Sequence, residues 1–253
     1  MLVGPRLGQA GEGVSKLSGL LRPTAFVSRV PPRVILLTSV VASTGLALAS
    51  PTTWPLWATA LLGLVPWIPP LVLGAMWNYR RYHWLALFYV LVVTQTAHFL
   101  EHVAQMSQIH LLGLQGAAAR GVFGSLDLEW VHFAWNAWVL VAALVLLCHF
   151  RDNPWLWFTA LFAGWHGIEH GYILKIYLGT GVVGTPGFLS QGGLIGGGLP
   201  LTRPDLHFLY NLIETVPLAI AFVWQARRTD SAHAVTRSFG EPAESLASAA
   251  TLP

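Results

Sequence analysis

Two short stretches of this sequence repeat one arrangement of histidine and glutamate. Residues 98–102 read HFLEH, and residues 166–170 read HGIEH, so both follow the pattern H-x-x-E-H. On a helix, residues three and four positions apart are neighbours on one face. Each stretch would therefore present two imidazoles and a carboxylate side by side. Both groups are common ligands of transition metals, so each stretch predicts part of a metal site.

A second pattern, H-F-x-[WY]-N, also occurs twice, at residues 132–136 and 207–211. Along the chain, H-x-x-E-H is followed by a loop containing glycine and then by H-F-x-[WY]-N, and this order occurs two times. The order predicts an internal repeat of two helices, with repeat A at 84–150 and repeat B at 154–226. Membrane proteins built from repeats place binding sites at the interface between the copies.

These motifs supply more ligands than one tetrahedral zinc ion requires. The candidate metal ligands are His98, Glu101, His102, Glu129, His132, His166, Glu169, His170, His207 and Glu214. Glu101 and Glu169 are also the candidate catalytic carboxylates, as bridging ligands or proton-transfer groups. Asn136 and Asn211 are candidates for supporting residues around the ligands or for hydrogen bonds between helices. The set predicts two metals, or one metal with a supporting network.

The ligand types favour some cofactors over others. Imidazole and carboxylate without thiolate favour iron or copper over zinc. Haem is disfavoured, because an axial histidine does not need a glutamate beside it. The single cysteine, Cys148, excludes an internal disulfide and any cysteine-based zinc or iron–sulfur site.

The composition places these motifs in a membrane protein. Hydrophobic residues make up 54% of the 253 residues and charged residues only 10%, whereas soluble domains carry about 25% charge. The net charge of +3 does not indicate a nucleic-acid partner, since basic residues commonly flank membrane segments. The expected partner is the lipid bilayer.

Apolar runs predict an all-α integral membrane protein with six transmembrane helices. They lie at residues 34–49, 54–77, 84–110, 128–149, 155–178 and 205–225, and the last four would form a four-helix core from the two repeats. Prolines 66, 69 and 70 predict a kink in the second span. The transmembrane domain, 34–228, would follow a disordered basic arm, 1–33, and precede a disordered tail, 229–253.

The basic residues predict the orientation in the membrane. With both termini in the cytoplasm, eleven of the fourteen lysines and arginines fall on the inner side, as the positive-inside rule requires. This topology predicts a plasma-membrane protein whose four motifs share the outer half of the bilayer.

Several functions are compatible with such a site. The favoured hypothesis is a metal-dependent membrane oxidoreductase of the oxygenase or hydroxylase type, acting on a lipid or a small apolar substrate. The long loop at 179–204 could then act as a lid. The alternatives are a copper or zinc binding, transport or delivery protein, a zinc-dependent membrane hydrolase, and a subunit of a larger membrane complex.

Overall fold

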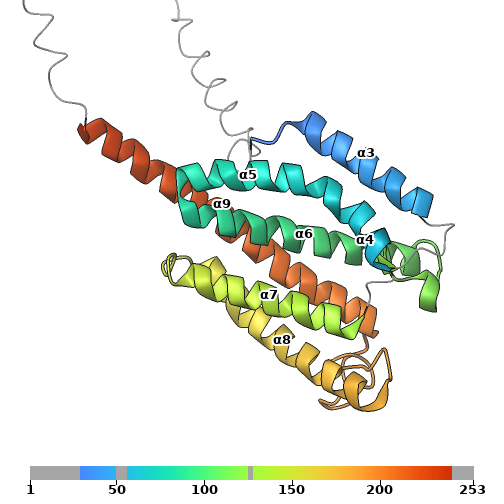
Figure 1. Cartoon of the computed structure of the whole chain (residues 1–253). Helices are drawn as coiled ribbons and strands as arrows, with labels where there is room; N and C mark the ends of the chain where they lie inside the picture. Colours follow the sequence, from blue (N-terminus) through green and yellow to red (C-terminus); the bar gives the residue numbers. More distant parts are fainter. Residues whose placement is uncertain (1–28, 50–55, 125–127, 241–253) are drawn as a thin grey trace, which may run out of the picture.

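The computed structural model describes residues 29–49, 56–124 and 128–240, and all its named elements are helices (Figure 1). The α-helices are α3 (Pro32–Ala49), α4 (Leu56–Leu64), α5 (Ile68–Arg81), α6 (His83–His110), α7 (Glu129–Leu147), α8 (Pro154–Thr180) and α9 (Arg203–Gly240). Two short 3₁₀ helices are η1 (Val65–Trp67) and η2 (Gly116–Ala118). The all-α prediction is confirmed. Most of the predicted N-terminal arm, and the tail from residue 241, lie outside the described residues.

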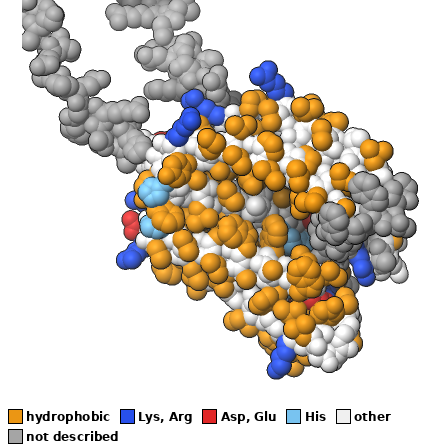
Figure 2. Space-filling model, viewed as in Figure 1, with side chains coloured by type: hydrophobic (Ala, Val, Ile, Leu, Met, Phe, Trp, Pro, Cys, Tyr) orange, Lys and Arg blue, Asp and Glu red, His pale blue; other side chains and the backbone are white. Residues whose placement is uncertain are grey.

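Five helical segments among the described residues are long and apolar enough to cross a membrane. They are Pro32–Ala49, Leu61–Arg81, His83–His110, Glu129–Leu147 and Arg203–Ser231. The α8 helix has 27 residues but is not among the five, because glycine, histidine, glutamate and lysine lower its hydropathy. Apolar side chains cover much of the face in Figure 2, as expected of a surface that contacts lipid.

The proline cluster interrupts the second predicted span, as the sequence indicated. Helix α4 ends at Leu64, and η1 carries Pro66 through one tight turn. Helix α5 then begins with Pro69 and Pro70 in its first turn. Proline is tolerated at these positions, because the first amides of a helix have no partner within the helix. The span therefore changes direction in the middle.

Helices α6 to α9 form a four-helix bundle, with α5 packed on α6 and α3 packed on α4 (Figure 1). One half of the bundle is an apolar core, which includes Phe88 of α6, Leu146 of α7, Leu156 of α8 and Phe222 of α9, each at most 1% exposed. The histidine motifs lie in the other half, since they come later in α6 and α8 and earlier in α7 and α9. The contact between α6 and α7 is the smallest of the four around the bundle.

The C-terminal helix extends beyond the predicted end of the sixth span. Helix α9 continues to Gly240, past residues 227 and 228, where the sequence predicted that the span would stop. The Arg81 side chain at the end of α5 forms an ion pair with Asp230, with Nε 3.0 Å from Oδ1. Arg81 also lies over the Trp77 ring, 4.5 Å from its centroid. These contacts attach the extension of α9 to α5.

Asn153 holds α8 in the bundle at the apolar end. Its Oδ1 caps α8 by accepting a hydrogen bond from the Leu156 amide at 3.1 Å, and its Nδ2 donates to the Ala221 carbonyl of α9 at 2.9 Å.

We expect Asn153→Ala to lower the free energy of unfolding by about 1–2 kcal/mol, through loss of the cap. Thermal unfolding in detergent, followed by circular dichroism, measures this change. Asp152→Ala, at an exposed neighbouring position, is the control, and equal effects of the two substitutions would contradict the prediction.

Candidate metal centre

Six histidines from four helices come together in one half of the bundle, and they come from all four predicted motifs. Their ligand atoms form two groups, and within each group the atoms lie within 4.8 Å of one another. The four-histidine group comprises His98, His102, His132 and His207, and the three-histidine group comprises His166, His170 and His207. His207 belongs to both groups. Among the described residues, no carboxylate joins either group.

In the three-histidine group, three ring nitrogens point toward one another. His166 Nε2 lies 3.1 Å from His170 Nε2 and 3.3 Å from His207 Nδ1. His170 Nδ1 and His207 Nε2 are buried and have no hydrogen-bond partner among the described residues. An unpaired buried polar atom is costly, and a metal ion is one partner that removes this cost at a nitrogen atom.

In His132, His102 and His166, a hydrogen bond at Nδ1 determines which ring nitrogen can bind a metal. His132 Nδ1 lies 3.1 Å from the Leu128 carbonyl, and His102 Nδ1 lies 3.3 Å from Gln105 Oε1. Because a carbonyl oxygen only accepts, each Nδ1 must carry the proton. Each Nε2 is then unprotonated in the neutral ring and is the nitrogen that can bind a metal. The Nε2 atoms of His98 and His102 are 3.2 Å apart.

Glu214 acts on His166 in the same way. Its side chain is 1% exposed, and Oε2 lies 3.1 Å from His166 Nδ1. A carboxylate in this position orients the ring and makes Nε2 a stronger ligand. The sequence predicted that Glu214 is a metal ligand. In the structure its carboxylate contacts Nδ1 of His166, whereas the candidate ligand atom of that ring is Nε2.

The glutamates of the two H-x-x-E-H motifs point toward the loops. Glu101 Oε1 accepts a hydrogen bond from the Phe123 amide, and Glu169 Oε1 accepts one from the Phe188 amide at 2.7 Å. A glycine passes close to each carboxylate, Gly121 with φ +83° and Gly187 with φ +75°. A Cβ atom on Gly187 would lie 2.5 Å from Glu169 Oε1. Both glutamates therefore attach a loop to a helix that carries two of the clustered histidines.

Glu129 lies at the start of α7 and is 3% exposed. Its carboxylate forms a two-point ion pair with Arg203, the first residue of α9, with Arg203 Nη1 2.8 Å from Glu129 Oε1. It also accepts a hydrogen bond from the Gly184 amide at 3.0 Å. The pair joins the ends of α7 and α9 to the loop between α8 and α9.

The two asparagines support the helices that carry His132 and His207. Asn136 Nδ2 donates to the His132 carbonyl at 3.0 Å, and Asn211 Nδ2 donates to the His207 carbonyl at 2.9 Å. Gln95, which the sequence analysis did not select, donates to Asn211 Oδ1 at 3.2 Å and is fully buried. Its position three residues before His98 on the same helix face was the signal that could have identified it.

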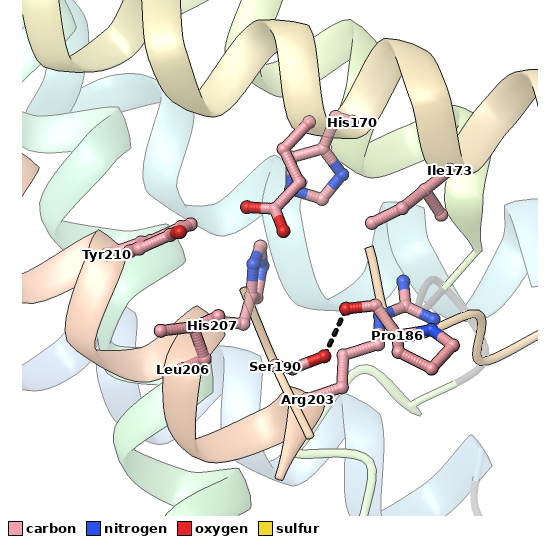
Figure 3. Close-up of a pocket in the computed structure, with 9 residues that line it drawn as sticks. His170, Ile173, Pro186, Ser190, Arg203, Leu206, His207 and Tyr210 are labelled. Carbon is pink, nitrogen blue, oxygen red and sulfur yellow. Dashed lines mark hydrogen bonds between the residues drawn. The ribbon is translucent and has the colours of Figure 1, made fainter. Parts of the chain in front are cut away.

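A small cavity opens beside the three-histidine group, under the loop that follows α8. Figure 3 shows His170 and His207 in its lining, with Tyr210 and Arg203 on opposite sides. The Ser190 hydroxyl, from the loop, donates to the Pro186 carbonyl at the edge of this cavity. The lining also includes the Glu169 carboxylate and the apolar side chains of Ile173 and Leu206, so it combines hydrogen-bonding groups, one cation, one carboxylate and apolar surface.

Comparisons with known proteins do not assign this centre to a family. No protein-family model matches the chain, and neither a curated protein nor a solved structure matches it.

The contact between Gly187 and Glu169 gives a test of the loop anchor. We expect Gly187→Ala to loosen the loop, because the added Cβ would overlap the carboxylate and the residue has a positive φ. Gly196→Ala is the matched control, since Gly196 also has a positive φ, of +62°, but has open space around its Cβ position. Limited proteolysis within residues 181–202 should be faster in Gly187→Ala, and equal rates in the two variants would contradict the anchor.

The ion pair between Glu129 and Arg203 should be a major stabilising contact. Removing one partner of a buried ion pair costs about 3–5 kcal/mol, because the other charge is left unpaired. We expect Arg203→Ala to destabilise the protein by about 3 kcal/mol. Unfolding of Glu129→Ala, Arg203→Ala and the double variant should show coupling of about 1–3 kcal/mol. Strictly additive effects would show that the pair does not act as a unit.

Proposed function

We propose that this protein is a membrane metalloprotein in which the six clustered histidines bind two transition-metal ions, and that it acts as an oxidoreductase. One observation carries the proposal: the ligand atoms of six histidines from four helices form two groups that share His207. Two ring nitrogens of the cluster, His170 Nδ1 and His207 Nε2, are buried without a hydrogen-bond partner among the described residues. Burial of a polar atom without a partner is costly, and this cost supports a bound cation in the cluster.

The all-imidazole groups support copper ahead of iron. Di-iron sites in helical bundles use glutamates from several helices as ligands. Here Glu101, Glu129 and Glu169 bind loop amides or Arg203, whereas the sequence alone suggested that they complete the metal shell. Copper binds imidazole readily. Zinc also binds imidazole but has no redox chemistry.

Equivalent contacts support the proposed repeat. Glu101 and Glu169 each bind the amide of a phenylalanine that lies one or two residues after a glycine with positive φ. Asn136 and Asn211 each bind the carbonyl of a histidine one turn earlier. We take repeat A and repeat B as tandem copies, with α8 as a sixth span between α7 and α9. Both termini would then be cytoplasmic and the centre would lie in the outer half of the plasma membrane.

The surroundings of the cluster support an apolar substrate. His98 and His207 are half-buried, while the other four ligand histidines are buried. Figure 2 shows imidazole surface in a hollow among apolar side chains on the face of α6 and α7. A lipid or small apolar molecule could approach from the bilayer there. When bound, the metals would supply electron transfer, while the protein would position the substrate and exclude water.

The apolar half of the bundle supports a resident centre over a transport path. Phe88, Leu146 and Phe222 close the interior toward the cytoplasmic ends of the helices. A transported ion would need polar ligands along this route, since charge inside a membrane is costly without partners. The described interior of that half offers none of the histidine pairs found in the other half.

Metal content of purified variants tests the proposal. We expect about two metal ions per chain in the native protein, and loss of at least one from His98→Ala and from His166→Ala, because each removes a ligand from one group. Glu101→Gln and His149→Ala are controls that should retain both, because neither side chain lies in a group. Metal retained in full by both histidine variants, or lost equally from the controls, would contradict the site.

The redox assignment has a separate test. The absorption spectrum of the metal-loaded protein should change on addition of dithionite and return on exposure to air. A spectrum unaffected by reductant would contradict an oxidoreductase, while leaving a metal-binding protein in place.

A further inference from the structure

His207 occupies the centre of the cluster. Its ring centroid lies 4.4 Å from that of His102 and 5.0 Å from that of His132, which belong to the four-histidine group. It also lies 5.1 Å from the His166 ring and 4.9 Å from the His170 ring, which belong to the three-histidine group. One imidazole therefore touches both halves of the site.

The two nitrogens of this ring have different surroundings. Nδ1 lies 3.3 Å from His166 Nε2, within the three-histidine group. Nε2 is buried and has no hydrogen-bond partner among the described residues. The two nitrogens are on opposite edges of the ring, so a ring that has lost its N–H proton can offer one lone pair from each edge.

We propose that His207 bridges two metal ions as an imidazolate, with Nδ1 on the ion of the three-histidine group and Nε2 on the ion of the four-histidine group. This inference rests on the proposed dinuclear centre and extends it. A neutral imidazole carries one proton on nitrogen, so binding the second metal releases that proton to water and leaves the ring with one negative charge. No electrons are transferred in this step.

The bridge gives the two ions different roles. The group of His98, His102, His132 and His207 would hold its ion with four protein ligands. The group of His166, His170 and His207 would supply only three, and would leave a position for an external ligand. The small cavity with Tyr210 and Arg203 adjoins His170 and His207 of that second group. We place the exchangeable ligand, water or oxygen, in this cavity.

Magnetic coupling tests the bridge. The full-length protein in detergent is loaded with Cu²⁺, unbound copper is removed, and bound copper is compared with the integrated electron paramagnetic resonance signal at low temperature. A bridging imidazolate couples the two unpaired electrons antiferromagnetically. We therefore expect two coppers per chain, with an integrated signal far below two spins per chain.

Two variants locate the coupling at His207. His207→Ala should bind copper whose signal integrates fully, because no bridge remains. His170→Ala takes a ligand only from the three-histidine group and should bind one fully visible copper even if His207→Ala does not fold. His149→Ala, at the other end of the bundle, should keep both coppers and the coupling.

The outcomes separate the bridge from the proposed centre. Two coppers that each integrate to a full spin would overturn the bridge and leave the dinuclear centre in place. One copper per chain in the native protein would overturn both the bridge and the dinuclear centre. Absence of bound copper, together with unchanged metal content in His98→Ala, would overturn the metal site itself.

Discussion

The burial of six imidazoles in one half of a membrane bundle is the constraint that organises this structure. A polar ring inside a low-dielectric interior must have its nitrogens satisfied, and residues outside the cluster meet that need. Leu128 and Gln105 bind the Nδ1 atoms of His132 and His102, and Glu214 binds that of His166. Two of the remaining nitrogens, His170 Nδ1 and His207 Nε2, are buried without a hydrogen-bond partner among the described residues. The other half of the bundle is apolar and supplies the packing that holds the four helices together.

The sequence was sufficient to predict the histidine cluster and the helical membrane fold, because both depend on local periodicity. Residues four apart on a helix lie close to one face, so His98 and His102 were expected to point the same way. The same geometry explains why Glu101 binds a loop amide and does not join the histidines, which the pattern did not reveal. At about 100° per residue, Glu101 is about 100° away from His102 around the helix. Glu101 thus lies at the side of the helix face that carries the two histidines, next to the loop that contains Phe123.

The contacts that could not be predicted join residues far apart in the chain. Glu129 pairs with Arg203, 74 positions later, and Gln95 binds Asn211, 116 positions later. No periodicity within one helix specifies such partners, since they depend on how the helices pack. The sequence predicted six membrane spans, but only five helical segments among the described residues are long and apolar enough to cross a membrane. The predicted span that is not among the five corresponds to α8, which packs between α7 and α9 and whose polar residues lower its hydropathy.

The ion pair between Glu129 and Arg203 also implies an order of biosynthesis. The chain is made from its N-terminus, so the carboxylate at the start of α7 is synthesised before the guanidinium with which it pairs. His207, four residues after Arg203, is the last of the six histidines to be made. The buried carboxylate and the histidine cluster therefore both depend on the start of α9 for their last partner.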